Sequence, residues 1–232
     1  MTLSAVIPAL DEAAALPALL ADLRALGDSL DEVVVVDAGS SDATAAVAVA
    51  GGARVVHAPR GRAHQLNAGA GSATGDWLLF LHADSRMGPD ARAAIRQVLA
   101  GIPPVEAATF RFAIDLPPRW RRFIESGQSL RETLTGLAYG DQGLLVRRDC
   151  FEEVGGYPEL PLMEDVAIVR RLRKQFGVTR LSAPVLTSGR RYLQRGILRT
   201  WLAHSLLISL YLAGVSPARL ARWRDSGAAH AR

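Results

Sequence analysis

Acidic side chains follow three apolar segments of the chain, at the points where each segment ends. Asp11 and Glu12 come after the first segment, Asp37 after the second, and Asp84 after the fourth. Carboxylates in such places can accept hydrogen bonds from the base and ribose of a nucleotide. One of them can also hold a divalent cation against a diphosphate, since Mg²⁺ binds oxygen ligands and substrate phosphates. The pattern predicts a pocket for a nucleotide-like ligand.

Arginines supply the opposite charge. Arg60 and Arg62 flank Gly61 after the third apolar segment, where guanidinium groups can contact an anion, although a purely solvated pair is the competing interpretation. The net charge is only +4, but arginines dominate the stretch after residue 169. A basic C-terminal third suits a phosphorylated ligand or an anionic surface.

The first 100 residues alternate strand and helix signals that explain how these groups meet. The four consecutive valines Val33–Val36 are typical of a parallel strand buried on both faces. This alternation predicts an α/β fold, and ligands bind such sheets beyond the carboxyl ends of the strands. The expected strands are residues 3–8, 33–36, 54–57 and 77–81, and helices are expected near residues 16–26, 42–50, 61–73 and 89–99.

The second half is less regular, and we keep one domain over residues 1–232. It divides into a nucleotide-binding half (1–100), an acceptor and catalytic half (101–190) and a C-terminal helical appendage (191–232). Strands are expected at residues 105–114 and 178–181, a loop running into a strand at 140–146, and helices at 119–134, 149–154, 164–176 and 198–213.

Composition excludes several classes of protein. The chain is 49% hydrophobic and 22% charged, which argues against disorder, and its one cysteine, Cys150, allows no internal disulfide. We therefore expect a reducing, cytoplasmic location without a signal peptide. The apolar helix at residues 198–213 is too short to span a bilayer. We expect it in the core or on a homodimer face, with peripheral contact to the inner membrane surface as the lesser alternative.

The loop after the first strand also excludes two nucleotide-binding classes. It contains no glycine, so it lacks the Gly-x-Gly-x-x-Gly turn of dinucleotide-binding folds. No Gly-x-x-x-x-Gly-Lys-Ser/Thr loop occurs in the chain either. Dinucleotide oxidoreductases and P-loop NTPases are therefore disfavoured.

Taken together, the motifs resemble those of family 2 glycosyltransferases, which have the GT-A fold, a Rossmann-type sandwich with a mostly parallel central sheet flanked by helices. The resemblance runs from residue 3 to about 220 and is carried by Val6–Glu12, Val34–Thr44, Leu81–Asp84 and Met163–Asp165. Arg60–Ala70 and Tyr139–Gly143 bring the chain nearest to a bacterial subgroup associated with arsenosugar biosynthesis.

The resemblance implies an inverting transfer of a sugar from a nucleotide donor to a hydroxyl acceptor. It implies Asp165 as the general base with Glu164 in support, and Asp84 as a ligand of Mg²⁺ or Mn²⁺ with His82 as a second ligand. No nucleic-acid partner is expected. The donor would contact a larger set of residues: Pro8, Ala9, Leu10, Asp11, Glu12, Asp37, Arg60, Arg62, Asn67, His82 and Ala83.

Two departures from the family pattern stand out. The metal motif begins with His82 where an aspartate is usual, so a neutral imidazole replaces one carboxylate and leaves the metal's identity open. The segment Arg190-Arg191-Tyr192 only loosely resembles the Gln-x-x-Arg-Trp element of processive synthases. We therefore expect transfer of a single sugar.

Each assignment has an alternative. Asp165 can be an acid that stabilises a helix N-terminus, Asp37 can cap a helix, and His82 is as readily a core histidine as a ligand. Asp141, in the loop Gly140–Gly143, is the competing base. A nucleotidyltransferase, or a non-catalytic nucleotide-binding or membrane-surface scaffold of the same fold, are the competing functions.

Overall fold

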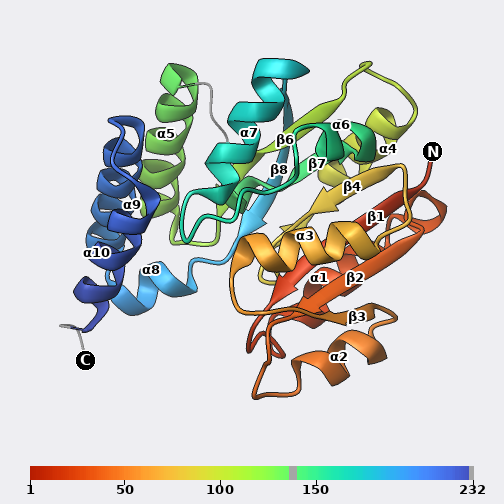
Figure 1. Cartoon of the computed structure of the whole chain (residues 1–232), viewed down its shortest axis with the longest axis horizontal. Helices are drawn as coiled ribbons and strands as arrows, with labels where there is room; N and C mark the ends of the chain where they lie inside the picture. The colour runs from red at the N-terminus through yellow and green to blue at the C-terminus, as the bar shows by residue number, and fades with distance from the viewer. Residues whose placement is uncertain (136–139, 230–232) are drawn as a thin grey trace.

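The computed structural model describes residues 1–135 and 140–229. Within them, eight strands form one sheet that runs through the middle of the molecule (Figure 1). They are β1 (Leu3–Ala9), β2 (Glu32–Asp37), β3 (Arg54–His57), β4 (Trp77–Phe80), β5 (Arg86–Met87), β6 (Ala107–Ile114), β7 (Leu144–Arg147) and β8 (Thr179–Thr187). Their order across the sheet is β3-β2-β1-β4-β7-β6-β8-β5.

The direction of the strands divides the sheet. β3, β2, β1 and β4 are parallel neighbours. β7 runs antiparallel to both β4 and β6, while β6 and β8 are parallel to each other and β5 opposes β8. Only β5 and β7 oppose the common direction among these strands. The expected mostly parallel α/β sheet is confirmed.

Helices cover both faces of the sheet. They are α1 (Leu16–Arg24), α2 (Thr44–Ala50), α3 (Arg62–Ser72), α4 (Pro89–Leu99), α5 (Pro118–Thr135), α6 (Arg148–Glu153), α7 (Glu164–Gln175), α8 (Arg190–Arg195), α9 (Ile197–Leu212) and α10 (Pro217–Ala229). α1, α2 and α4 pack on one face, and α3, α6 and α7 pack on the other.

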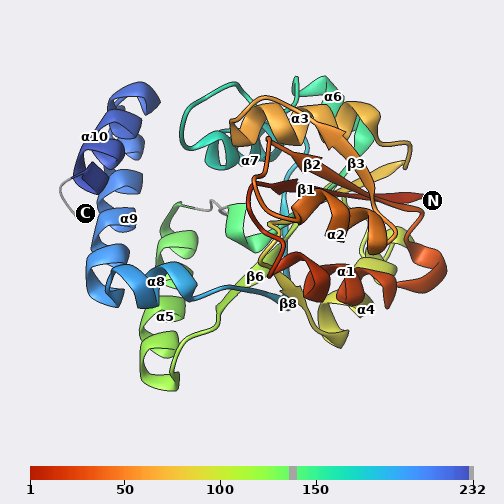
Figure 2. The same ribbon diagram turned by 90° about the horizontal axis from the view of Figure 1, so that it is seen from below.

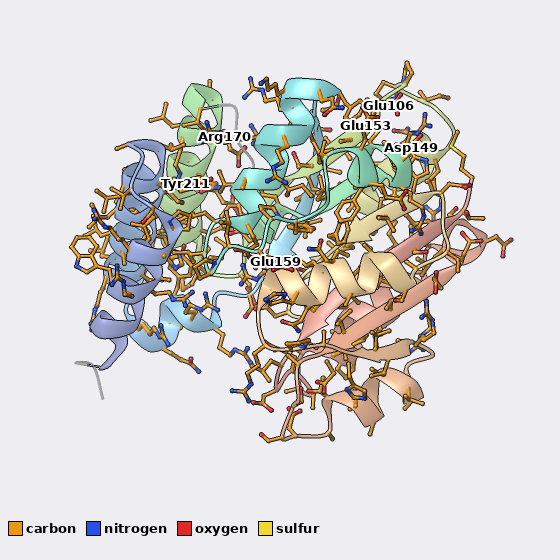
Figure 3. The ribbon with its side chains drawn as sticks, in the orientation of Figure 1. Glu106, Asp149, Glu153, Glu159, Arg170 and Tyr211 are labelled. Atoms are coloured by element: carbon orange, nitrogen blue, oxygen red, sulfur yellow. The ribbon has the colours of Figure 1, made fainter. Side chains whose placement is uncertain are left out.

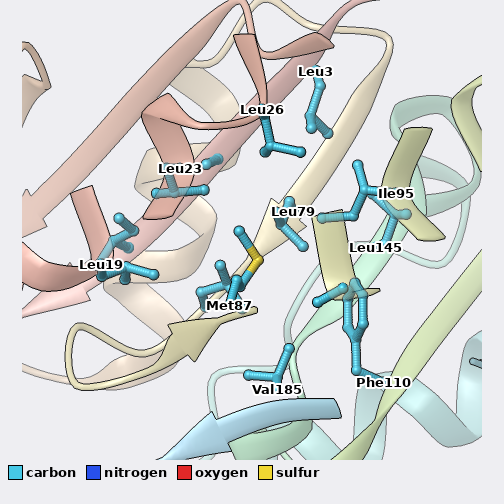
Figure 4. Packing of buried hydrophobic residues seen from close by; sticks show 14 of the residues in the cluster. Leu3, Leu19, Leu23, Leu26, Leu79, Met87, Ile95, Phe110, Leu145 and Val185 are labelled. Carbon is cyan, nitrogen blue, oxygen red and sulfur yellow. The ribbon is translucent and has the colours of Figure 1, made fainter. Parts of the chain in front are cut away.

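The valine strand explains why both faces are filled. Val35 belongs to the core beneath α1 and α4, whereas Val34 and Val36 belong to the core beneath α3 and α7. Successive side chains of a strand point to opposite faces, so an apolar strand of this kind needs cover on both sides. Figure 4 shows the first core, where Leu19 and Leu23 of α1 lie near Leu79 and Met87.

The remaining helices form a separate group at one end of the molecule (Figure 2). α5, α8, α9 and α10 lie beyond the sheet, joined to it by a small core in which Phe112 and Ile114 of β6 pack with Ile124 and Trp201. Phe123 of α5 also stacks against Trp201, with ring centroids 4.9 Å apart. The expected C-terminal helices are present, and their outer surface faces away from the sheet.

Most elements lie within two residues of their expected bounds, and three elements depart from the prediction. β8 extends to Thr187, although the prediction ended it at Leu181, because the strand continues past Pro184 with a register shift against β6. The two-residue strand β5 and the short helix α8 were not predicted, since neither is long enough to show a periodic pattern. Tyr139 of the predicted motif lies outside the described residues.

Candidate active site

The carboxyl ends of β1, β2 and β4 lie together at one edge of the sheet. β1 sits between β2 and β4, so the chain leaves neighbouring strands toward opposite sides at this point, which is where ligands bind in open α/β sheets. Ala9 pairs with Asp37 in the β1–β2 register. Gln65 of α3 is buried behind them and donates to the carbonyls of Ala9, at 3.0 Å, and Val36, at 2.9 Å. These two hydrogen bonds fix the carboxyl ends of β1 and β2 relative to α3.

Asp37 stabilises the turn that follows β2. Its carboxylate is 3% exposed and accepts hydrogen bonds from the backbone N–H groups of Gly39, at 3.2 Å, and Ser40, at 3.2 Å, and from the Ser40 hydroxyl. Gly39 has φ 81°, a conformation that suits glycine. Asp37 does not cap α2, which begins at Thr44. Its contact with a nucleotide base remains a prediction.

The loop after β1 is bound to the loop after β2. The Asp11 carboxylate accepts hydrogen bonds from the backbone N–H of Ser41, at 2.7 Å, and from the Ser41 hydroxyl, at 3.0 Å. These bonds lower the pKa of Asp11. Asp11 has φ 55°, an unfavourable value for a residue other than glycine, and such conformations concentrate at functional sites.

Glu12 links this loop to α8. Its carboxylate lies 3.2 Å from a guanidinium nitrogen of Arg190, 178 residues later in the chain. Burial raises the pKa of Glu12, Arg190 opposes the increase, and the negative charge of Asp84 adds to it. Arg190 is thus a site residue that the predicted set lacked. The basic composition of the C-terminal third was the available signal.

Arg191 adds a second cation of α8 beside Arg190. Partial burial lowers the pKa of its guanidinium, and the positive charges of Arg62 and Arg195 lower it further, while Asp84 opposes the change. Arg62 and Arg191 also act together on His82. α8 therefore completes a group of cations around the loop after β4.

His82 and Asp84 occupy that loop. Burial lowers the pKa of His82 to about 3, and the nearby Arg62 and Arg191 add to the effect. The imidazole is therefore neutral at physiological pH and has a nitrogen lone pair available. The loop turns tightly, with the Ser85 N–H donating to the His82 carbonyl at 3.0 Å. The half-buried Asp84 interacts electrostatically with both Glu12 and Arg191.

A small cavity of about 20 Å³ lies beside the loop after β4. It lies where α3 and α7 approach the ends of β4 and β7, and Arg62, His82, Tyr157 and Asp165 line it. Residues from positions 62 to 165 thus share one enclosed space. Burial raises the pKa of the Tyr157 hydroxyl, and the charges of Asp165 and Glu164 raise it further.

The Glu164–Asp165 pair begins α7 on the far side of this cavity. Glu164 is 3% exposed and lies 3.3 Å from Arg62. Burial and the adjacent charge of Asp165 raise the pKa of Glu164. Asp165 accepts a hydrogen bond from the Val166 N–H at 2.7 Å, as an acid at a helix N-terminus does. Met163, just before them, has φ 67°, so the backbone is again strained beside a predicted site residue.

Asp141 is the second carboxyl group near Asp165. It lies in the 3₁₀ turn Gly140–Gln142, with its Oδ1 atom shielded from water and without a hydrogen-bond donor among the described residues. Burial raises the pKa of Asp141 to about 7, and the negative charge of Asp165 contributes to the increase. The site thus contains two interacting carboxyl groups, one of which is favoured in its protonated form below neutral pH.

The other residues predicted to bind the donor differ in their exposure to solvent. Ala9 and Ala83 are buried, Pro8 and Asp84 are half-buried, and Leu10 and Arg60 are exposed at the strand-end loops.

Asn67 holds a loop in place, and its contact with the donor stays a prediction. Its side chain donates to the Tyr157 carbonyl at 2.8 Å and accepts from the Tyr157 N–H at 2.9 Å. Both ends of the amide are therefore engaged in fixing a loop. His64, on the same helix, pairs with Glu159, which lies beside the N-terminal end of α3 (Figure 3), at 3.6 Å.

The side chains around the β4 loop suit a metal that is only partly held by protein. Among the described residues, no group of three His, Cys, Asp or Glu side chains gathers closely enough to hold an ion alone. Asp84 offers oxygen ligands and the neutral His82 offers nitrogen. Mg²⁺ and Mn²⁺ commonly complete their coordination with substrate phosphates and water, so this small set of donors fits such an ion.

The family model of "Glycosyl transferase family 2" matches residues 4–155 of the chain. A TPR repeat-containing protein of Synechococcus elongatus is 37% identical over 91 residues, which are 38% of this chain and 22% of that protein. Glucosyl-3-phosphoglycerate synthase of Mycobacterium tuberculosis is 34% identical over 93 residues, 36% of this chain and 29% of the enzyme. The matches thus span less than a third of these relatives.

Solved structures agree on the fold. The structure of the M. tuberculosis synthase with Mn²⁺, UDP and glucosyl-3-phosphoglycerate has a TM-score of 0.58 at 20% identity, covering 81% of this chain and 70% of that one. The same enzyme with Mg²⁺ and UDP has a TM-score of 0.59 at 19% identity, covering 81% and 69%. The GT-A fold expected from the resemblance is confirmed.

Proposed function

Since this chain belongs to glycosyl transferase family 2, we propose that it transfers a sugar from a nucleoside diphosphate donor to a hydroxyl acceptor, with inversion at the anomeric carbon. One observation carries the proposal. Arg62 lines a cavity together with His82 and Asp165, and it also pairs with Glu164. A group that neutralises phosphate charge and a carboxylate that can accept a proton therefore face the same space.

The donor would bind along the carboxyl edge of the sheet. Asp37 and the joined loops after β1 and β2 offer a rigid surface for the base and ribose. Arg62, Arg190 and Arg191 would surround the diphosphate. Negative charge grows on the diphosphate as it leaves, and fixed positive charges that meet it there lower the barrier without supplying a proton.

A divalent cation fits this arrangement beside Asp84, with His82 as a second ligand. When bound, it would neutralise diphosphate charge as a Lewis acid. The solved structures of the M. tuberculosis synthase contain Mn²⁺ or Mg²⁺ with UDP, which supports the same pairing here. The finer features, UDP as donor and a small hydroxyl acceptor, are part of the proposal.

Asp165 is the proposed general base. Its carboxylate would accept the proton of the acceptor hydroxyl as the acceptor oxygen bonds to the anomeric carbon and the bond from that carbon to the diphosphate breaks. Attack occurs from the face opposite the leaving group, so a single displacement inverts the centre. Glu164, held by Arg62, would keep the helix start in place. General bases of this kind contribute about 10²–10⁴-fold to rate.

Asp141 remains the competing base, and its shielded position near Asp165 supports a second role. A carboxyl group that is protonated below neutral pH is a poor base, but it can coexist with an ionised neighbour. We therefore propose that Asp141 limits the negative charge around Asp165 rather than accepting the proton.

A non-catalytic nucleotide-binding scaffold is the second candidate function, because Asp84 is the single carboxylate of the expected metal motif. Membership of the bacterial arsenosugar-type subgroup is kept as a proposal on the Arg60–Ala70 and Tyr139–Gly143 motifs, and a cytoplasmic location is kept as a proposal on the single cysteine.

Thermal unfolding with UDP, GDP and dTDP, each with and without Mn²⁺, tests the function. We expect one diphosphate to raise the unfolding temperature in a metal-dependent way, and Asp84→Asn to abolish the metal dependence. Slow hydrolysis of the matching nucleotide sugar then separates an enzyme from a scaffold. No response to any diphosphate would contradict the proposal, and binding without hydrolysis or transfer would favour the scaffold.

A further inference from the structure

The outer surface of the C-terminal helices carries exposed leucines in a regular row. Leu198, Leu202 and Leu206 follow one another at four-residue spacing along α9, so they share one face of the helix. Each is at least 50% exposed. Leu193 of α8 and Trp223 of α10 are 59% and 58% exposed. We call these five residues the apolar outer face.

The opposite side of α9 is already occupied. Trp201 packs against Phe123 of α5, and Ile208 belongs to the core beneath α7. Tyr211 lies on the side of α9 toward α5 and α7 (Figure 3). α9 therefore makes its interior contacts without using the leucine row, and nothing in the described part of the chain covers that row.

The charge around this face is predominantly positive. Residues 190–229, which span α8 to α10, contain seven arginines and a single acid, Asp225. Arg195, Arg199, Arg219 and Arg222 are exposed, and no salt bridge within the described part of the chain involves them. A second copy of the same face would bring these positive charges together, which opposes a dimer. Exposed leucines beside unpaired arginines instead complement an anionic lipid surface.

We propose that the apolar outer face docks the protein on an anionic bilayer, with the leucines and Trp223 entering the interface and the arginines meeting lipid phosphates. None of the helices in the described ranges is long and apolar enough to cross a bilayer, so the contact is peripheral. α8 carries both Leu193 and Arg190, which reaches Glu12 in the site. Docking would thus place the edge of the active site next to the lipid surface.

Vesicle sedimentation tests the proposal without any assay of activity. Vesicles of phosphatidylcholine and phosphatidylglycerol in a two-to-one ratio are compared with phosphatidylcholine alone, in physiological and in high salt. We expect binding to the anionic vesicles only, weakened by salt. The triple variant Leu198→Gln, Leu202→Gln, Leu206→Gln should bind at least about tenfold less tightly, because apolar burial drives insertion.

Charge variants separate the two contributions. Arg195→Gln, Arg199→Gln and Arg222→Gln should each weaken binding about fivefold. Val49→Gln and Ile102→Gln, exposed apolar residues on α2 and after α4, and Arg24→Gln on α1 are the matched controls, and they should bind as the parent does. All variants should keep the parent's unfolding temperature and its response to nucleoside diphosphate.

Three results would overturn the proposal. The first is equal binding to both kinds of vesicle or to neither. The second is anionic-vesicle binding that the leucine variant retains. The third is a dimer in sedimentation velocity that the leucine variant dissociates, which would assign the face to a second copy of the chain.

Discussion

The carboxylates of the site fall into two groups that differ in their surroundings. Asp11 and Asp42, in the loops after β1 and β2, accept hydrogen bonds from backbone N–H groups and hydroxyls, and these bonds lower the pKa of both acids. Asp141 and Glu164, around the start of α7, are buried near another negative charge, and the pKa of each is raised. Hydrogen bonds favour the ionised form of the first group, whereas burial and a neighbouring charge disfavour the ionised form of the second.

This difference suggests a division of labour. Ionised carboxylates that accept several hydrogen bonds hold loops in one shape, which suits recognition of a rigid base and ribose. Carboxyl groups with raised pKa values can hold a proton near neutral pH, which limits the negative charge around the proposed base, Asp165. Glu12 belongs to neither group, because its carboxylate forms an ion pair with Arg190 of α8.

The largest expected effect distinguishes Asp165 from Asp141 as the proton acceptor. Asp165→Asn should lower the rate of sugar transfer about 10³-fold, because the amide cannot accept the hydroxyl proton. Product formation measured by mass spectrometry checks this, with diphosphate-induced stabilisation as the binding control. Asp141→Asn is the matched variant and should retain transfer. Activity lost in Asp141→Asn and kept in Asp165→Asn would exchange their roles.

The pH dependence of stability should expose the raised pKa of Asp141. The folded value is about 7 against 3.8 for an unperturbed group, so the folded state binds more protons than the unfolded state between these values. The ionisation penalty therefore grows as pH rises from about 4 to about 7. Asp141→Asn should be more stable than the parent above pH 7, by about 2–4 kcal/mol, with little difference below pH 4.

Urea denaturation of both proteins across this pH range measures the difference. A difference in unfolding free energy that does not change with pH would show that Asp141 is well solvated in the folded protein.

On the recognition side, Asp37→Ala should lower the unfolding free energy by about 2 kcal/mol, because the N–H groups of Gly39 and Ser40 and the Ser40 hydroxyl lose their acceptor. Asp37→Asn, which keeps one oxygen, should recover part of that loss. Chemical denaturation measures both. An unchanged stability in Asp37→Ala would mean that the turn does not depend on the carboxylate.

The smallest expected effect concerns the ion pair between Arg190 and Glu12. Arg190→Gln removes the ion pair with Glu12, which is partly exposed, so the unfolding free energy should change by less than about 1 kcal/mol. Its metal-dependent response to nucleoside diphosphate should nevertheless weaken. A large loss of stability with unchanged diphosphate binding would assign Arg190 to structure alone.

The first half of the fold was predictable because its strands are short apolar runs and its helices follow at regular spacing. Val33–Val36 indicated a strand buried on both faces. Asp37 was predicted as a site residue because it comes directly after that strand. Sequence could not reveal that Arg190 reaches Glu12, since the ion pair joins residues 178 positions apart through a six-residue helix.

Asn67 shows a different limit. It was predicted to bind the donor because it follows the Arg60–Arg62 pair in a motif of the family. In the structure its amide is also bonded at both ends to the backbone of Tyr157, 90 residues later. A polar residue that pins a loop and one that binds a ligand look alike in sequence, because the distinction depends on a partner distant in the chain.

A crystal structure of the chain with Mn²⁺ and the nucleoside diphosphate that stabilises it is the decisive measurement. We expect the base beside Asp37, the cation on Asp84, guanidinium groups of Arg62 or Arg190 on the phosphates, and Asp165 facing the side where the sugar would lie. A diphosphate bound elsewhere, or an Asp165 carboxylate walled off from it, would contradict the proposed mechanism.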